Sequence, residues 1–210
     1  MDTALVVLAK APETAKARLA AAIGRAAATR VAAALLDDAL ARGETGAFAP
    51  RFLDWDGPAD HPVPVRAGRG DWTCRSQAAG NLGRRMERAL AAALEHAPRA
   101  LLMGTDCPDL GGPALASAAR HLDSADLVLV PAVDGGYALI GAGRGARPHL
   151  HDLFAGMAWG GSGVAAATRE RARRGGFVVA ETETLRDLDD AADLAALAGR
   201  HPFLAAAQRY

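Results

Sequence analysis

Two groups of charged residues follow apolar runs that are typical of buried β-strands. Asp106 comes shortly after the apolar run 100–103, within the sequence LLMGTDCPDL. Lys10, Lys16 and Arg18 follow the first apolar run of the chain, within the sequence AKAPETAKARLAAAIG. Open α/β folds bind ligands at the carboxyl ends of their parallel strands, so both groups are candidates for one binding site.

The three cations predict a site for a phosphate chain. Ammonium and guanidinium groups would meet phosphate oxygens together with the unpaired N–H groups at the start of the helix that follows. The alternative is that these side chains are ordinary solvated lysines and an arginine. For Asp106 the alternative is a turn residue or helix cap, because Asp-x-Pro sequences often begin helices. Asp109 is expected to be such a cap, since Gly111, Gly112 and Pro113 follow it.

The rest of the chain predicts an α/β fold that could place these groups together. Its 210 residues are 50% hydrophobic, which suits one domain, residues 1–210, with a full core. Short apolar runs alternate with alanine-rich stretches, a pattern that predicts a mainly parallel sheet flanked by helices. We expect strands at 5–8, 51–54, 100–103, 126–130, 137–140 and 177–179. We expect helices near 25–42, 83–97, 113–122, 163–174 and 190–199. Residues 57–70, rich in proline and glycine, are expected to form a long connection that is mobile near the site.

Composition excludes several classes of function. Lysine plus arginine equals aspartate plus glutamate at 24 each, so no net charge favours nucleic acid. The apolar run 4–9 is too short to span a membrane and lacks the flanks of a secretory signal, so we expect a cytoplasmic protein. Cys74 and Cys107 do not form a CxxC pair and are expected to be reduced, with Cys107 a buried filler and not a nucleophile. Nothing in the sequence predicts the oligomeric state.

Six motifs, in this order, give the chain a family resemblance. They are LAKAPETAKARLA, QAAGNLGRRMERAL, LLMGTDCPDL, LVLVPAVDGGYALIGAG, LHDLFAGMAW and LRDLDDAADLAAL. The chain resembles the DUF2064 group of GT-A-like transferases, which is similar to small nucleotidyltransferases. The resemblance implies a single-domain GT-A fold, a nucleotide or nucleotide-sugar donor, a small-molecule acceptor, and Mg²⁺ or Mn²⁺.

The resemblance also implies roles for the charged residues. Lys10, Lys16 and Arg18 match the phosphate-binding loop, and Asp106 matches the metal-binding aspartate. Asp187 and Asp189 match the second pair of metal carboxylates. Asp189 is the preferred ligand of the two, although it could equally be the N-cap of the helix that follows.

The remaining candidates concern the acceptor and the nucleoside. The acceptor side is expected to include Asp134, Gly135, Gly136, Tyr137 and Trp159. The two glycines would let the backbone approach a ligand and Asp134 would accept hydroxyl hydrogen bonds, unless Asp134 is a turn residue. Trp159 would stack on a base or sugar, or else fill the core. Gln77 is expected to border the nucleotide, whereas Arg84 and Arg85 are expected on a solvated helix face.

These roles predict transfer of a glycosyl or nucleotidyl group. Lys16, Asp106 and Asp134 are the predicted catalytic residues, and positioned positive charge would supply most of the catalysis. The chain departs from the family pattern at Thr14-Ala15, where Pro-Gly is usual, and at GGSGV after Trp159, where a Ser-Thr pair is common. The first change removes a glycine and is expected to reshape the phosphate loop. It leaves a non-catalytic nucleotide- or sugar-nucleotide-binding protein as the alternative function.

Overall fold

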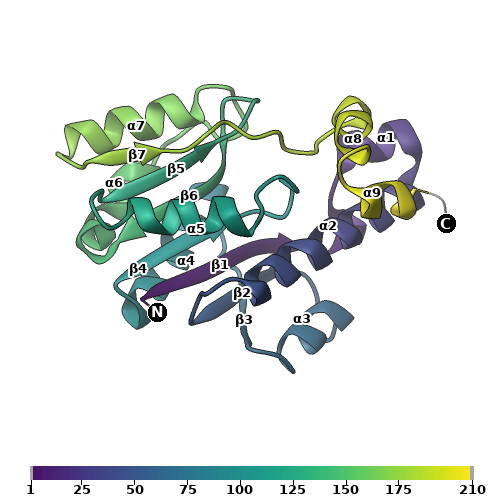
Figure 1. Cartoon of the computed structure of the whole chain (residues 1–210), viewed down its shortest axis with the longest axis horizontal. Helices are drawn as coiled ribbons and strands as arrows, with labels where there is room; N and C mark the ends of the chain where they lie inside the picture. The colour runs from purple at the N-terminus through teal and green to yellow at the C-terminus, as the bar shows by residue number, and fades with distance from the viewer. Residues whose placement is uncertain (1, 209–210) are drawn as a thin grey trace.

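A computed structural model describes residues 2–208 of the chain. Seven strands form one sheet in the order β3-β2-β1-β4-β6-β5-β7 (Figure 1). The strands are β1 (Thr3–Lys10), β2 (Arg51–Asp56), β3 (Trp72–Ser76), β4 (Arg99–Met103), β5 (Leu127–Pro131), β6 (Tyr137–Gly143) and β7 (Val179–Glu181). Strand β6 is antiparallel to both of its neighbours, and the other four pairings are parallel. The predicted α/β class with a mainly parallel sheet is confirmed.

Helices flank the sheet and extend beyond one end of it. The α-helices are α1 (Ala17–Ile23), α2 (Arg25–Thr45), α3 (Pro62–Ala67), α4 (Leu82–His96), α5 (Gly112–His121), α6 (Leu150–Phe154), α7 (Val164–Arg174), α8 (Ala191–Ala198) and α9 (Pro202–Ala207). Two short 3₁₀ helices, η1 (Pro12–Thr14) and η2 (Arg144–His149), complete the order. None of the helices in the described part of the chain has the length and apolar character needed to cross a membrane.

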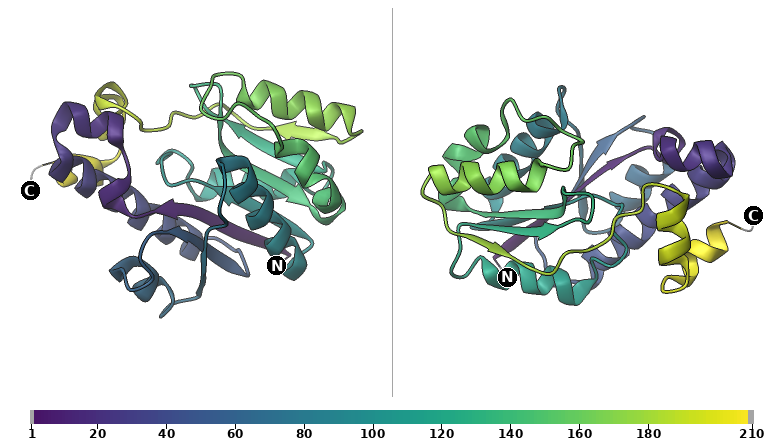
Figure 2. Two further views of the ribbon diagram at one scale, coloured as in Figure 1. Left: turned by 180° about the vertical axis from the view of Figure 1, so that it is seen from behind. Right: turned by 90° about the horizontal axis from the view of Figure 1, so that it is seen from above.

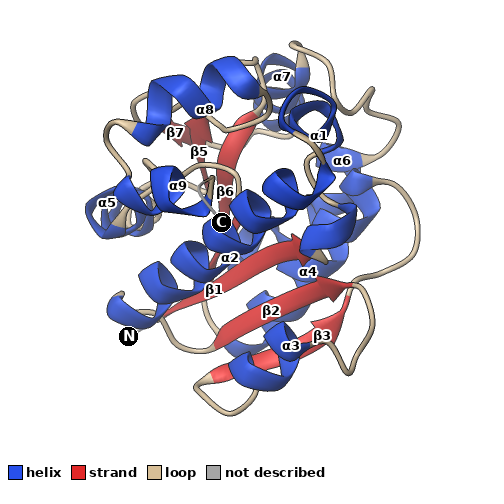
Figure 3. Cartoon of the chain, turned by 90° about the vertical axis from the view of Figure 1, so that its right-hand side faces the viewer, coloured by secondary structure: helices blue, strands red, loops and turns tan. Residues whose placement is uncertain are grey.

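The core divides into two layers because successive side chains of a strand point to opposite faces. In β1, Leu5 and Val7 pack against α2, α3 and α5, whereas Val6 packs on the face covered by α4 and α6. Strands β4 and β5 alternate in the same way. Figure 3 shows α2 lying along β1 on one face of the sheet. The sheet is therefore apolar on both sides, as a sheet covered by helices on both faces requires.

A third apolar cluster lies at the end of the molecule that carries the chain's C-terminal helices. Leu19 of α1 and Leu35 of α2 pack there with Leu188, Leu194 and Leu204. Figures 1 and 2 show α1, α8 and α9 together at this end, joined to β7 by a segment that crosses the molecule. The cluster therefore brings the first connection of the chain next to its last one.

The expected connection at 57–70 is wrong in one respect. Residues 62–67 form α3, and Val63 and Ala67 are buried in the core beneath the sheet edge. Proline is compatible with the first turn of a helix, and the His61 side chain caps this one by accepting a hydrogen bond from the backbone N–H of Val63. Strand β3 was also missed, since only Trp72 and Cys74 alternate with polar residues in its sequence WTCRS, which is too short a pattern to identify a strand. Within residues 57–70 no side chain lines the cleft described below.

Candidate active site

A cleft of about 620 Å³ lies along the carboxyl ends of β1, β2 and β4. The antiparallel β6 starts at the same edge, so Tyr137 also reaches the cleft. Its charged lining residues are Lys10, Lys16, Arg18, Asp56, Arg85, Asp106, Asp187 and Asp189. Cations and carboxylates that are far apart in sequence therefore share one concave surface, as ligand sites in open α/β folds do.

The loop after β1 holds Lys16 in an unusual conformation. Lys16 has φ 56° and ψ 47°, and within residues 2–208 no other non-glycine residue has a positive φ. Ala15 has φ −82° and ψ 168°, an extended conformation that any residue adopts. The alanine at this position is therefore compatible with the loop. The expected reshaping of the loop relative to the family pattern stays a prediction.

Lys16 directs its ammonium group into a buried network. Its side chain is 4% exposed, and Nζ lies 2.9 Å from Oδ1 of Asp106 and 3.7 Å from Oδ1 of Asp189. The same ammonium group donates a hydrogen bond to the carbonyl of Leu188. A buried ammonium requires such partners, because an unpaired one would be strongly destabilising.

The other two cations of the first loop differ from Lys16. The guanidinium group of Arg18 is 72% exposed and donates a hydrogen bond to Oδ2 of Asp189. Lys10 is exposed at the end of β1, and no carboxylate of the described residues pairs with it. The structure thus brings the three predicted phosphate-binding cations to one cleft but gives each a different environment.

Asp106 lies in the loop between β4 and α5. It caps no helix, because α5 begins at Gly112 with Gly111 as its N-cap. Its carboxylate instead faces Lys16, and its carbonyl accepts a hydrogen bond of 2.8 Å from the backbone of Leu188. Asp109, expected to be a cap, is also not one. It binds Arg200 and His201, which ties the loop to the C-terminal helices.

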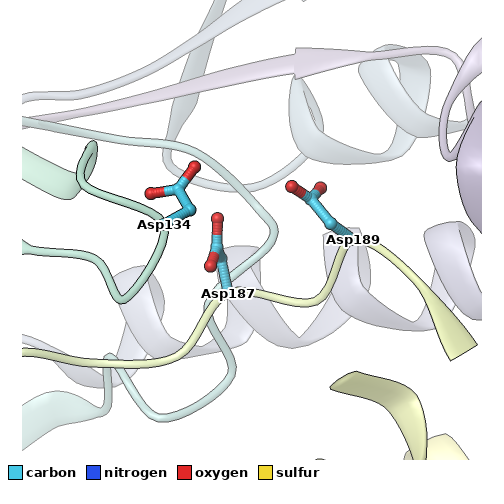
Figure 4. Close-up of side chains that lie close together, drawn as sticks. All are labelled: Asp134, Asp187 and Asp189. Carbon is cyan, nitrogen blue, oxygen red and sulfur yellow. The ribbon is translucent and has the colours of Figure 1, made fainter. Parts of the chain in front are cut away.

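Three carboxylates form a cluster at the edge of the cleft, which Asp187 and Asp189 line and Asp134 does not. Asp134, Asp187 and Asp189 each offer an oxygen, and these atoms lie within 4.8 Å of one another (Figure 4). Asp134 comes from the turn between β5 and β6, and the other two come from the segment before α8. Burial and the neighbouring charge of Asp134 raise the pKa of Asp187 to about 6. Such a cluster of oxygen ligands suits a hard divalent cation.

The segment that carries Asp187 and Asp189 is held by its ends. Leu185 donates a backbone hydrogen bond to Pro131, the last residue of β5, and accepts one from Val133, at 2.9 and 3.0 Å. At the other end, Asp190 and Asp193 form a capping box at the start of α8. The N-cap is therefore Asp190, which excludes that role for Asp189. The carboxylate of Asp193 also accepts the backbone N–H of Asp189 at 3.1 Å and so positions it.

The turn DGGY has structural reasons for its residue types. Asp134 accepts the backbone N–H of Gly136 at 2.8 Å, as a turn aspartate does. Gly135 has φ 88°, and a Cβ atom there would lie 2.0 Å from the carbonyl oxygen of Ser162. A glycine is therefore required at position 135 because the backbone of the loop before α7 occupies the space of a side chain there. The phenol of Tyr137 is buried near Thr168, and burial raises its pKa.

Gln77 lies at the cleft with its amide group already occupied. Its NH₂ group donates to the carbonyls of Ala9 and Asp54 at 2.7 and 2.9 Å, which ties the ends of β1 and β2 together. Its oxygen accepts a hydrogen bond of 3.1 Å from Arg85, which also pairs with Asp56 at 2.6 Å. The expectation of a solvated Arg85 is wrong, because this side chain lines the cleft. Arg84 pairs with Glu87 on the exposed face.

The two remaining candidates are packed against apolar neighbours. Trp159 lies with its ring centroid 6.1 Å from that of Phe154, and a Cβ atom at Gly83 would collide with the indole. It belongs to the edge of the core on the α4 face and does not line the cleft of the described residues. Cys107 is buried, and burial raises its pKa to about 12, so its thiol stays protonated. Both cysteines are free.

Asp56, Arg85 and Asp193 contribute to the site but were not predicted from the sequence. Asp56 ends β2 at the same sheet edge, so the rule that singled out Asp106 would also have found it. Arg85 gave no such signal, because α4 also carries the exposed arginines Arg84 and Arg88, from which residue type cannot distinguish it. Asp193 stands three residues after Asp190, which is the spacing of a capping box.

Sequence comparison places most of the chain in one family. A family model described as "Uncharacterized protein conserved in bacteria (DUF2064)" matches residues 39–161. That region contains Asp106 and Asp134, whereas the cations of the first loop and the carboxylates before α8 lie outside it. No curated protein matches the chain in sequence.

Solved structures share the fold over nearly the whole chain. A protein from Desulfovibrio desulfuricans G20, described as a candidate nucleotide-diphospho-sugar transferase, is 29% identical with a TM-score of 0.84, covering 94% of this chain and 87% of that one. A nucleotidyl transferase from Methanothermobacter thermautotrophicus is 15% identical with a TM-score of 0.65, covering 98% and 99%. A Mycobacterium tuberculosis H37Rv protein, determined in complex with manganese, is 21% identical with a TM-score of 0.55, covering 94% and 98%. The chain therefore has the fold of nucleotide-sugar and nucleotidyl transferases.

Proposed function

The chain belongs to the DUF2064 family, and on that premise we propose that it is a metal-dependent transferase with a nucleotide or nucleotide-sugar donor. The family match confirms the resemblance found in the sequence motifs. The proposed reaction is the transfer of a glycosyl or nucleotidyl group to a small-molecule acceptor. In either reaction a bond to the donor's phosphate chain breaks, and negative charge develops on the phosphates.

One observation carries this proposal. The cleft places three cations of the first loop, Lys10, Lys16 and Arg18, beside carboxylates that include Asp187 and Asp189. A phosphate chain requires positive charge, whereas a divalent cation requires oxygen ligands. The cleft offers both the positive charge and the oxygen ligands, on neighbouring groups of side chains. The site therefore suits a donor that binds together with its metal.

The acidic cluster fits a divalent cation such as Mg²⁺ or Mn²⁺. Asp134, Asp187 and Asp189 would hold the ion, because their oxygens converge. Burial, together with the charge of Asp134, raises the pKa of Asp187. Bound there, the ion would oppose the charge that develops on the donor phosphates. Asp106 stays a predicted ligand as well, since its side chain is 47% exposed.

The chain's own residues supply binding and orientation. Lys10 and Arg18 would bind the donor phosphates from the open side of the cleft, and Lys16 would keep Asp106 and Leu188 in position. Gln77 would fix Arg85 and Asp56 at the end of the cleft formed by β1 and β2. Asp134 and the start of β6 would face the acceptor. No covalent nucleophile is required, because positioning and fixed positive charge account for catalysis of this kind.

A non-catalytic nucleotide- or sugar-nucleotide-binding protein stays the alternative function. That alternative depended on Ala15, whose backbone is in an ordinary extended conformation. We propose a transferase in preference to it, because the cations of the first loop and the carboxylates share one cleft.

A thermal-shift panel tests the proposal. The full chain would be melted with each nucleoside triphosphate and with common nucleotide-diphospho-sugars, with and without Mn²⁺. We expect a donor to raise the melting temperature only when Mn²⁺ is present, because a ligand of the folded state stabilises it by mass action. Asp187→Asn is the matched variant and should lose the response. An increase in melting temperature that is the same with and without Mn²⁺ would contradict the proposal, and so would the absence of any increase.

The donor found in this way would then be incubated with acceptors of several chemical classes. Release of pyrophosphate would identify nucleotidyl transfer, and release of a nucleoside diphosphate would identify glycosyl transfer.

A further inference from the structure

We propose that Arg18 is a displaceable counter-ion of Asp189, so that the phosphate chain of the donor and the divalent cation bind the cleft cooperatively. The inference rests on the proposed function, since it concerns the same cleft and the same ion. It adds a specific claim, namely that Arg18 opposes metal binding in the protein without donor and ceases to do so when phosphate binds.

Asp189 is neutralised from both of its oxygens. Arg18 donates to Oδ2, and the ammonium of Lys16 lies 3.7 Å from Oδ1. Asp189 is also one of the three carboxylates whose oxygens converge. A divalent cation at the cluster must therefore share Asp189 with a guanidinium group or replace it.

The two cations are not equally able to leave. The side chain of Lys16 is 4% exposed and has two further partners, Asp106 and the carbonyl of Leu188. The side chain of Arg18 is 72% exposed, and Asp189 is its one partner within the described residues. Exposed ion pairs contribute little to stability, so Arg18 can exchange Asp189 for another anion at small cost.

A phosphate chain is the natural competitor for Arg18. Guanidinium groups bind phosphate oxygens in a bidentate manner and with charge assistance. When Arg18 turns to phosphate, Asp189 loses a cation and its affinity for a metal ion rises. By thermodynamic reciprocity, a bound metal ion must also release Arg18 and so favour phosphate binding.

Calorimetric titration of Mn²⁺ alone into the nucleotide-free full chain tests this inference. The variants are Arg18→Gln, Arg18→Lys and Lys10→Gln, with Asp189→Asn and Arg18→Gln/Asp189→Asn to complete a cycle. We expect Arg18→Gln to bind Mn²⁺ about tenfold more tightly than the unmodified protein, a coupling of ordinary size. Arg18→Lys keeps the charge and should stay close to the unmodified protein.

Lys10→Gln is the matched control. It removes one cation from the same cleft, but that cation pairs with no carboxylate of the described chain, so Mn²⁺ affinity should change little. In the Asp189→Asn background, Arg18→Gln should have no further effect, because the pair is already broken. Melting curves of each variant would show that the folded state is intact.

The outcomes separate this inference from the proposed function. Unchanged or weaker Mn²⁺ binding by Arg18→Gln, in a protein that still shows a metal-dependent donor response, would overturn the inference alone. Equal tightening by Arg18→Gln and Lys10→Gln would also overturn it, since general charge would then explain the effect. Absence of Mn²⁺ binding by every variant, with or without donor, would overturn both.

Discussion

The carboxylates of the cleft fall into two groups that differ in what neutralises them. The first group is paired, with Arg85 on Asp56, Lys16 on Asp106 and Arg18 on Asp189. The second group consists of Asp134 and Asp187, which have no basic partner among the described side chains. Paired carboxylates hold the ends of β1, β2 and β4 to the loops around them. Unpaired ones cost stability, and a metal ion from solution would relieve that cost.

Removal of an unpaired carboxylate should have the largest effect on metal binding. Asp187→Asn is expected to weaken Mn²⁺ binding by at least about 100-fold. This exceeds the usual effect of mutating a residue that only hydrogen-bonds to a metal ligand. Calorimetric titration measures this, and Asp56→Asn is the control because it removes a paired carboxylate from the same cleft. Similar losses in the two variants would erase the distinction between the groups.

Removal of a buried cation should mainly affect stability. Lys16→Met is expected to lower the free energy of unfolding by ~2 kcal/mol, because Asp106 and Asp189, which are themselves partly exposed, would lose a buried partner. Urea denaturation measures the loss. Arg18→Gln breaks an exposed pair and should cost less than about 0.5 kcal/mol. If the two variants lost equal stability, burial would not be what distinguishes these pairs.

The protonation of Asp187 should make both stability and metal affinity depend on pH. Its pKa of about 6 lies above the ordinary value of 3.8, so between these values the folded protein holds a proton that the unfolded chain releases. Its contribution to stability therefore falls as pH rises from about 4 to about 6. Metal binding should follow the opposite direction, with Mn²⁺ affinity about tenfold weaker at pH 5 than at pH 7.5, because the ion competes with that proton.

Two measurements would check this behaviour. Calorimetric titrations at several pH values give the metal affinity, and melting curves without metal give the stability. In Asp187→Asn the part of the stability change that falls between pH 4 and 6 should be smaller. A metal affinity that stays constant across this range would mean that Asp187 is not a ligand.

The smallest effect is expected from the unpaired cation. Lys10→Ala should weaken donor binding about fivefold, equivalent to ~1 kcal/mol, while leaving the melting temperature unchanged. The reason is that the described structure gives Lys10 no carboxylate to stabilise. Calorimetry with the donor found by thermal shift checks the first part, and a melting curve checks the second. A clear loss of stability would place Lys10 among the paired cations.

The sequence was sufficient for most regular elements. The apolar runs of β1, β4 and β5 and the alanine-rich helices α2 and α4 carry clear periodicity, and each lies within a few residues of its predicted position. The pattern failed at the sheet edge, where β3 and α3 are short and gain their stability from packing. An edge strand such as WTCRS needs little apolar sequence, so periodicity could not identify it.

The site was predictable where its residues are close together in sequence. Lys10, Lys16 and Arg18 lie in one connection and could be recognised from residue type and spacing. Which carboxylate pairs with which cation could not be read in this way, because Lys16 meets residues about 90 and 170 positions away only after the sheet has formed. The meeting of Asp134 with Asp187 depends likewise on the antiparallel β6 and on the path of the chain after β7.

From the path of the chain after β7 we expect the segment that carries Asp187 and Asp189 to open separately from the sheet. Between Thr182 and the cap at Asp190, the segment is fixed by backbone hydrogen bonds at Leu185 and at Leu188. The buried Leu188 side chain and the contacts of Lys16 and Arg18 hold the segment as well. We expect Asp187 and Asp189 to detach when these contacts and hydrogen bonds break, while the sheet stays folded. The fraction of molecules with an assembled site is therefore set by the free energy of this local opening, not by that of global unfolding, and slow hydrogen exchange at these two amides would report it.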